Sequence, residues 1–416
     1  MDPGSADRVG GWARARHLAG EPLRARTSAH DRGELVVTAK DAKTGQLIEG
    51  LCVFVELMER KFVCDKGTSV RVTRLPTQVP LVVGVVANPE RFYMSGGSIV
   101  TLDGEKPTAH EQTLALGGRV STKVVSRATG KGVGSVEVEL RGADHPYSGG
   151  ATVDPNGKLV TSAMPPGRYR LWVSPDPRTS LGAQWVGDKG GTGREHLATV
   201  VTVEEGKMTV APKVRLDEGG ALEGTFLNPD GTPAADVLLS TQQLRYFDFM
   251  VSGWNTDSVG DYHLPNLGPY DWSLRAHPFD GAVTEQWAGG EVRGDRAHTV
   301  RVVPGKTTEW NVRLARGTAL SGAVNATGEL ERGIGFYDAT TGESAGSLMH
   351  GAADTTYQTH VLGGGRYKAW QVTIVDDVTA VDGWHDSAAT FETATPVSVP
   401  HSDAATADLR FTVRGR

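Results

Sequence analysis

The stretch Val100-Thr-Leu-Asp-Gly-Glu-Lys106, which continues to Leu116, is the first of four similar stretches that decide the fold. The other three begin Val201-Thr-Val-Glu-Glu-Gly-Lys207, Val300-Arg-Val-Val-Pro-Gly-Lys306 and Val397-Ser-Val-Pro-His-Ser-Asp403. Each has the pattern of a short alternating strand, a polar turn and a second alternating strand. The copies lie about a hundred residues apart, which is too far for solenoid repeats of roughly 20–50 residues and matches an independent domain. The chain is therefore predicted to be a string of similar domains.

The composition agrees with a string of small β domains. A length of 416 residues predicts roughly three or four domains. The 53 glycines and 21 prolines indicate frequent turns, and long periodic stretches are few. The net charge of -6 gives no reason to expect a nucleic-acid partner. No apolar run of about 18 residues is present, so we expect no membrane insertion.

Glycines mark the predicted boundaries, at Gly117-Gly118, Gly219-Gly220 and Arg316-Gly317. We expect an all-β fold of four tandem small antiparallel β-sandwiches with almost no linker between them. The chain would then be a semi-rigid rod, and we expect a monomer. The predicted domains are residues 34–116, 117–216, 217–315 and 316–416.

Residues 1–33 are predicted to be a disordered N-terminal segment, with arginines among Gly, Ala and Asp. No apolar stretch follows, so the segment as written is not a secretory signal peptide. A start site assigned at the wrong place, or a fragment of a longer chain, would give the same appearance.

The only cysteines, Cys52 and Cys64, lie in the first predicted domain. A turn near Glu59-Arg60 would make a hairpin that places them opposite each other on adjacent strands, within reach of a disulfide. Closing a loop of about 13 residues would stabilise the fold by about 3 kcal/mol in the chain-entropy model. The alternatives are two buried free thiols or a different register. A disulfide would indicate an oxidising compartment.

Further motifs recur in a fixed order in the predicted domains. Asn228-Pro-Asp-Gly-Thr-Pro233 is a turn after a first strand, and Met164-Pro-Pro-Gly-Arg-Tyr169 precedes a later strand. Leu267-Gly-Pro-Tyr270 matches the second motif in part. A Pro-Gly-x-Tyr turn directs the tyrosine back under the preceding connection, where its hydroxyl can bond to the backbone.

Together these motifs resemble the carboxypeptidase regulatory-like domain and the related collagen-adhesin B-type repeats, over about 380 residues. The resemblance implies a Greek-key, transthyretin-like or starch-binding-like sandwich. It also implies a secreted or cell-surface location and an accessory, adhesive or carbohydrate-binding role without catalysis.

Aromatic residues recur in a glycine-rich loop before each last strand pair. Gln184-Trp185-Val-Gly187 recurs as Gln286-Trp287-Ala-Gly289, and Trp384 and Tyr93 hold comparable places in the other two domains. A tryptophan face can stack on a sugar, and a neighbouring glutamine can bond to hydroxyl groups. These six residues are therefore the candidate ligand-binding residues. The alternative is that each ring covers its own sandwich or packs at a domain junction.

Two short motifs resemble those of hydrolases and phosphate-binding loops when they are considered without their surroundings. Gly342-Glu-Ser-Ala-Gly346 fits the Gly-x-Ser-x-Gly of hydrolases, but no helical periodicity follows it, so a loop is the preferred interpretation. Gly305-Lys306-Thr307 resembles the end of a phosphate loop, but Val300 stands where that loop needs glycine. The twelve histidines show no metal-ligand spacing. We therefore expect no catalytic residue, no metal and no cofactor.

The leading functional hypothesis is a non-catalytic bacterial spacer or interaction protein, secreted or on the cell surface. The alternative is a carbohydrate-binding accessory protein that acts with a polysaccharide hydrolase. The candidate partners are a polysaccharide or another surface protein. Exposure of Trp185 and Trp287 separates the two hypotheses, because buried rings cannot stack on sugar.

Overall fold

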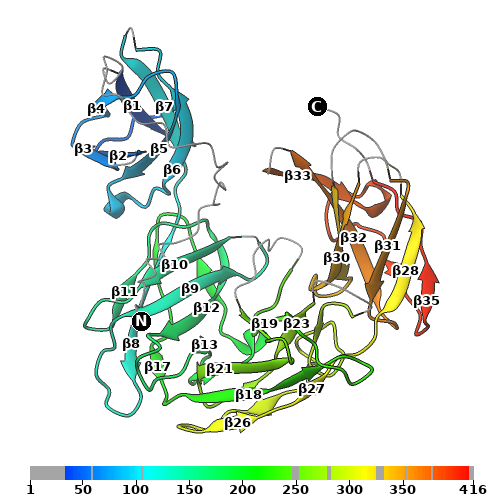
Figure 1. The fold of residues 1–416 in the computed structure, drawn as a ribbon. Helices are drawn as coiled ribbons and strands as arrows, with labels where there is room; N and C mark the ends of the chain where they lie inside the picture. The colour runs from blue at the N-terminus through cyan, green and yellow to red at the C-terminus, as the bar shows by residue number, and fades with distance from the viewer. Residues whose placement is uncertain are drawn as a thin grey trace. The chain divides into compact units, whose positions relative to one another are not determined.

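The computed structural model describes residues 33–57, 60–104, 106–145, 147–245, 253–278, 283–324, 332–351, 354–375 and 378–411. In these ranges the regular structure is almost entirely β-strand (Figure 1), which confirms the predicted all-β fold of tandem β-sandwiches. The helices described are short 3-10 turns: η1 (Pro89–Arg91), η2 (Glu195–Leu197) and η3 (His385–Ser387). None of the helices found there has the length and apolar character needed to cross a membrane. The segment predicted to be disordered lies outside the described residues, apart from Gly33.

The first sandwich consists of two sheets with strand orders β4-β1-β7 and β3-β2-β5-β6. Its strands are β1 (Gly33–Asp41), β2 (Leu51–Glu56), β3 (Lys61–Asp65), β4 (Ser69–Leu75), β5 (Pro80–Ala87), β6 (Gly96–Thr101) and β7 (Thr108–Leu114). Alternation is strict on β1, where Leu35, Val37 and Ala39 are fully buried and the residues between them are partly exposed. This period of two places one face of each sheet in a common core.

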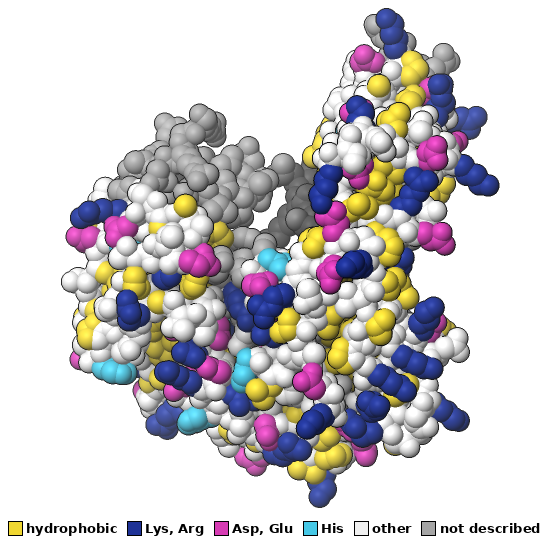
Figure 2. Space-filling model, turned by 180° about the vertical axis from the view of Figure 1, so that it is seen from behind, with side chains coloured by type: hydrophobic (Ala, Val, Ile, Leu, Met, Phe, Trp, Pro, Cys, Tyr) yellow, Lys and Arg dark blue, Asp and Glu magenta, His cyan; other side chains and the backbone are white. Residues whose placement is uncertain are grey.

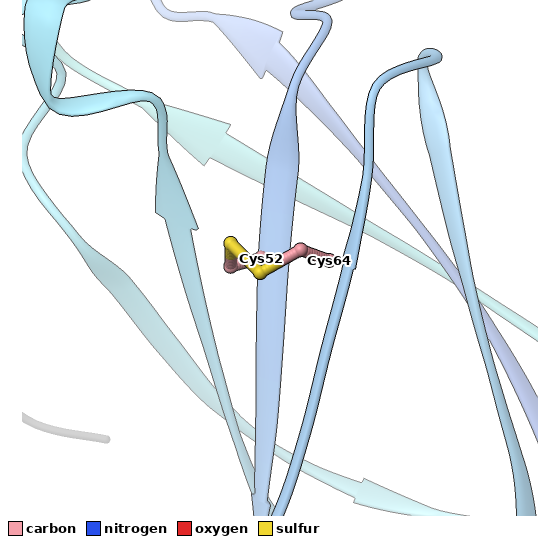
Figure 3. Close-up of a disulfide and its surroundings, with 2 residues drawn as sticks. All are labelled: Cys52 and Cys64. Carbon is pink, nitrogen blue, oxygen red and sulfur yellow. A yellow bond between two sulfur atoms is a disulfide. The ribbon is translucent and has the colours of Figure 1, made fainter.

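A disulfide crosses the outer face of this sandwich (Figure 3). Strands β2 and β3 are antiparallel neighbours, and Cys52 lies directly opposite Cys64 with a Cα–Cα distance of 4.0 Å. The predicted disulfide and its hairpin are therefore confirmed. Glu59, in the predicted turn, lies outside the described residues. Beside the bridge, the Phe54 ring lies across Gly84, where an added Cβ would sit 1.9 Å from a ring carbon.

The second sandwich has sheets ordered β10-β9-β12-β13-β14 and β11-β8-β16, with β15 also paired to β12. Its strands are β8 (Arg119–Ser126), β9 (Val136–Gly142), β10 (Ser148–Thr152), β11 (Lys158–Val160), β12 (Gly167–Pro175), β13 (Gln184–Val186), β14 (Gly191–Thr192), β15 (Val201–Val203), β16 (Met208–Val210) and β17 (Val214–Leu216).

The third sandwich has sheets ordered β21-β18-β26 and β20-β19-β23-β24, with the short pair β22-β25 beside them. Its strands are β18 (Gly220–Leu227), β19 (Leu238–Ser240), β20 (Trp254–Asn255), β21 (Asp261–Leu267), β22 (Asp271–Trp272), β23 (Arg275–His277), β24 (Gln286–Trp287), β25 (Val300–Arg301), β26 (Thr307–Glu309) and β27 (Val312–Arg313). Its core includes Phe226, Leu264 and Trp272.

The fourth sandwich has sheets ordered β31-β28-β35 and β30-β29-β32-β33, with β34 paired to β32. Its strands are β28 (Thr318–Ala323), β29 (Arg332–Asp338), β30 (Ser344–His350), β31 (Thr356–Val361), β32 (Arg366–Val375), β33 (Val378–Trp384), β34 (Val397–Ser398) and β35 (Ala404–Thr406). The domain boundaries drawn from the sequence remain a prediction.

The fourfold sequence signature has one structural role throughout. Its first strand (β6, β15, β25 or β34) pairs in one sheet, and the strand after the polar turn (β7, β16, β26 or β35) pairs in another. That later strand lies parallel to the first strand of its own sandwich in every copy. The signature is therefore the crossing that closes the sandwich, and it adds a parallel pair to sheets that are mostly antiparallel; in the third sandwich β27 also lies parallel to β18.

The tyrosine turn predicted at Tyr169 forms, and Tyr367 makes the same kind of turn in the fourth sandwich. The hydroxyl of Tyr169 donates to the carbonyl of Pro165 at 2.6 Å, and that of Tyr367 donates to the carbonyl of Leu362 at 2.5 Å. Both rings are fully buried, and burial raises the pKa of both hydroxyls. These tyrosines hold the connection before the strand, as expected of a fold motif.

The contacts divide the chain into two compact units, and the second comprises residues 126–130, 172–199 and 214–416. On the face shown in Figure 2, Lys, Arg, Asp and Glu are interspersed with apolar side chains. This mixture agrees with the modest net charge of -6.

Candidate functional site

The Gln286-Trp287 loop is built to turn inward. Strand β24 pairs antiparallel with β23, with Arg275 opposite Trp287. After it, Gly289 and Gly290 have φ of 96° and 73°, which glycine adopts without strain. The backbone N–H of Trp287 donates to the backbone carbonyl of Glu291 at 2.7 Å. The loop thus folds back on itself, and the Trp287 side chain is only 3% exposed.

The indole of Trp287 binds a carboxylate from the fourth sandwich. Its Nε1–H donates to Oε2 of Glu343 at 2.9 Å, and the backbone N–H of Gly294 donates to the same oxygen at 3.0 Å. Nη1 of Arg275 lies 3.9 Å from it. Burial raises the pKa of Glu343, and the nearby Arg275 and the two donors oppose that shift. This carboxylate therefore joins the loops of two successive sandwiches.

A second carboxylate extends the contact. Arg275, which is fully buried, donates to Oε2 of Glu285 at 3.0 Å and also to the carbonyl oxygen of Ser344. Ser344 Oγ donates to the same Glu285 oxygen at 2.7 Å, and Thr284 Oγ1 donates to the Ala345 carbonyl at 2.7 Å. Burial acts to raise the pKa of Glu285, but its cationic and hydrogen-bonding neighbours outweigh it and lower that pKa. The start of β30 is thus held by side chains of the third sandwich.

Gln286 fixes the chain where it passes between the sandwiches. Its Oε1 accepts from the N–H of Ala315 at 2.8 Å, and its Nε2 donates to the carbonyl of the same residue at 3.0 Å. Ala315 lies directly before the predicted boundary at Arg316-Gly317. Gln286 is 1% exposed, so this amide is a buried clamp on the connection.

The equivalent pair in the second sandwich, Gln184-Trp185, has a related role. Gln184 Oε1 lies 2.7 Å from the hydroxyl of Tyr270, which also lies 2.6 Å from Oδ2 of Asp217. Asp217 in turn pairs with Arg127, with Nε 2.5 Å from Oδ1. Trp185 is fully buried. Tyr270, whose motif resembled a tyrosine turn, therefore bonds to the preceding sandwich and not to its own connection.

The other two aromatic positions stay within their own sandwiches. The hydroxyl of Tyr93, which is partly exposed, donates to Asp41 Oδ2 at 2.9 Å. Trp384 is 5% exposed and stacks on Trp370, with ring centroids 5.7 Å apart. No buried ring in this set presents a face to a sugar. The structure thus favours the packing interpretation of Gln184, Trp185, Gln286, Trp287 and Trp384.

The hydrolase-like motif lacks the geometry of a nucleophile elbow. Ser344 begins strand β30, and no helix follows it. Its hydroxyl bonds directly to Glu285, whose lowered pKa makes that carboxylate a weak base. Gly305-Lys306 forms the turn between β25 and β26. In the described ranges no three His, Cys, Asp or Glu side chains are grouped as metal ligands would be.

The charged members of this junction were not predicted from the sequence. Arg275 and His277 stand in the short strand Arg-Ala-His, and all three residues are buried. A charged residue in a buried strand needs a partner, which is the signal that could have pointed to Arg275. Nothing local identifies Glu343 as that partner, because it lies 68 residues further along the chain.

No family model matches the chain, and no curated protein matches it either. Similar solved structures include the Bacillus anthracis TIE protein, at 10% identity and a TM-score of 0.21, with 94% of this chain and 76% of that chain covered. Others are the minor pilin GBS52 of Streptococcus agalactiae (13% identity, 48% and 96% covered, TM-score 0.21) and the major pilin subunit BcpA of Bacillus cereus (10% identity, 68% and 99% covered, TM-score 0.17). Likenesses at this level assign neither a family nor a function. The fold and the junction define the class, a protein of tandem β-sandwiches.

Proposed function

We propose that this chain is a non-catalytic multi-domain spacer and interaction protein that acts outside the cell or at its surface. The observation that carries the proposal is the use of the Gln-Trp loops. Each loop contacts the next sandwich, through Tyr270 in one case and through Glu343 in the other, and Gln286 also holds Ala315 at the connection. Residues that fix consecutive sandwiches are what a semi-rigid spacer needs.

Three further points support this proposal. The Cys52–Cys64 disulfide fits an oxidising compartment. Ser344 lacks a base able to activate it, so the one hydrolase-like motif does not favour catalysis. The candidate sugar-stacking rings Trp185 and Trp287 are buried, so the carbohydrate-binding alternative at these loops loses its support. A monomer of four sandwiches, with another surface protein as partner, is the form we propose.

Solution scattering of the whole chain tests the spacer role. Trp287→Phe removes the indole donor to Glu343 while keeping an aromatic ring. We expect a broader distribution of conformations and faster proteolysis around Ala315, because the junction loses a buried contact. Trp254→Phe, on β20 and partly exposed, is the matched control. Scattering and proteolysis of Trp287→Phe that match those of the control would contradict the proposal.

A further inference from the structure

Strand β6 is an edge of the sheet ordered β3-β2-β5-β6 in the first sandwich, so only one side of its backbone pairs within that sheet. Its register with β5 runs from Gly96 to Thr101 without a shift. Every second residue of such an edge directs its N–H and C=O away from the sheet, where they can pair with another chain. This strand is therefore a template of six residues for a further strand.

The sequence of β6 lacks the features that normally protect an edge from pairing, which are charged side chains, proline and bulges. It reads Gly-Gly-Ser-Ile-Val-Thr, with no charged residue and no proline, and its register has no bulge. The other edges among the described strands of this sandwich carry ionisable residues, namely Lys61 and Asp65 on β3, Arg71 and Arg74 on β4, and His110 and Glu111 on β7. This contrast singles out β6 as the edge that is open to a partner.

The outer face of the sheet is apolar beside this edge. Ile99 is 72% exposed, and Val82, directly opposite it on β5, is 46% exposed. Val82 alternates with the buried Leu81 and Val83, so this paired Val82 and Ile99 face away from the core. An apolar side chain on an added strand would lie against Ile99 and remove this surface from water.

The other face of β6 is polar, because it lies next to β7. Ser98 Oγ lies 2.7 Å from Nε2 of His110, and both side chains are partly buried. A small hydroxyl side chain on an added strand can extend this hydrogen bonding, since a hydroxyl both donates and accepts. The two faces of β6 therefore favour different side chains on the strand that joins it.

Charged side chains do not suit this position, because nearby charges are already paired within the protein. Glu56 on β2, two strands away, pairs with Arg60 at 3.2 Å. Lys40 on β1 pairs with Glu111 on β7 at 2.7 Å. A charge on the added strand would lose hydration beside Ile99 without gaining a partner.

We propose that β6 binds an extended, uncharged segment of the partner protein, which adds to the four-stranded sheet as a fifth strand. Apolar and hydroxyl side chains alternate in that segment, with the apolar ones beside Ile99 and the hydroxyl ones beside Ser98. Backbone hydrogen bonds supply the affinity, and the alternation supplies the selectivity. The inference rests on the proposed interaction role and names the surface that this role uses.

Fluorescence anisotropy on the whole chain tests the proposal. The probe is a labelled peptide with the core Thr-Val-Thr-Val-Thr-Val between Gly-Ser ends, and we expect saturable binding with a Kd below about 1 mM. One control peptide has proline in place of the central threonine, which removes a backbone donor, and another has lysine in place of each valine. We expect both to bind at least tenfold more weakly. Absence of binding by the probe, or equal binding by either control peptide, overturns the proposal.

Hydrogen exchange of the whole chain, followed by mass spectrometry, locates the peptide. We expect the peptide to slow exchange of the amides of β6, residues 96–101, and to leave those of β3 unchanged. Protection confined to another strand refutes the assignment. Amides of β6 that already exchange as slowly as those of β5 without peptide would also refute it, because another part of the chain or a second copy would then cover the edge.

Single substitutions separate edge pairing from simple contact with the apolar face. Ile99→Lys and Thr101→Lys each place a charge at an exposed position of β6, and we expect each to weaken binding at least tenfold. Phe62→Lys, at a 62% exposed position on the opposite edge β3, should change binding less than twofold. Val210→Lys adds the same charge at a 79% exposed position of β16 in the second sandwich and is the matched control.

Unchanged binding in both β6 variants, or an equal loss in Phe62→Lys or Val210→Lys, would show that the peptide does not pair with β6. Failure of the peptide to bind leaves the scattering test of Trp287→Phe unaffected, because that test concerns the third and fourth sandwiches. The two proposals can therefore fail separately.

Discussion

Replacing Glu343 with alanine tests whether the junction network holds the third and fourth sandwiches together. The carboxylate accepts from Trp287 and Gly294 and faces Arg275, all within 4 Å, and it is 2% exposed. Removing one partner of a buried ion pair costs about 3–5 kcal/mol. Because Arg275 keeps Glu285 at 3.0 Å, we expect the lower end, about 3 kcal/mol.

Differential scanning calorimetry on the whole chain is the suitable assay, because a multi-domain chain does not unfold in one two-state step. For a cooperative unit of about 200 residues, 3 kcal/mol corresponds to a fall in Tm of about 6–12 °C. Glu343→Gln keeps an acceptor oxygen and the shape of the side chain, so we expect a smaller loss of about 1 kcal/mol.

Glu223→Ala is the control for this experiment. Glu223 faces His263 at 3.7 Å in an exposed pair, so its loss should cost less than about 1 kcal/mol. If Glu343→Ala melts within about 2 °C of the wild type or of Glu223→Ala, the network does not couple the sandwiches and the reasoning is wrong.

Three further predictions concern single sandwiches. Changing Cys52 and Cys64 to serine removes a bridge over 12 positions and should cost the first sandwich about 3 kcal/mol; equal Tm values with and without the bridge would contradict this. Tyr367→Phe should cost about 1 kcal/mol. Because the pKa of the Tyr367 hydroxyl is raised, its contribution is present below about pH 10 and is lost as the pH rises through the folded pKa, so the variant should lose less stability in alkali than the wild type. Hydrogen bonds from Thr44 and Tyr93 lower the pKa of Asp41 to about 2. Its contribution is therefore complete above about pH 4 and is lost towards pH 2, and Asp41→Asn should flatten the Tm profile in that window.

The sequence was sufficient for the parts of the fold that depend on local patterning. Alternation on β1 predicted a half-buried strand, and Cys52 and Cys64 lay at positions that a hairpin would pair. The fourfold signature was correctly predicted as strand, turn and strand. Its role in crossing between sheets was not, because that depends on which distant strand each half pairs with.

The contacts of the candidate site could not be predicted from local sequence patterns. The sequence shows the repeated Gln-Trp pairs, and it allows two interpretations of them, stacking on a sugar or packing within the protein. Sequence could not choose between the two, because exposure of a ring depends on what the following sandwich places against it. For Trp287 that partner is Glu343, 56 positions away. Arg275 meets Ser344 across 69 positions. Contacts of this range leave no periodic signal.

The chemistry of the junction bears on the proposed spacer role more than on stability. Burying Arg275, Glu285 and Glu343 costs desolvation, and ion pairs of this kind often return little net stability compared with apolar residues. Apolar contacts have little angular preference. Two sandwiches that met only through apolar side chains would therefore have several relative orientations of similar energy. Hydrogen bonds from Arg275 to Glu285 and from Trp287 to Glu343 require defined angles as well as distances. A spacer gains from that requirement, because its length and direction depend on each sandwich holding one orientation to the next.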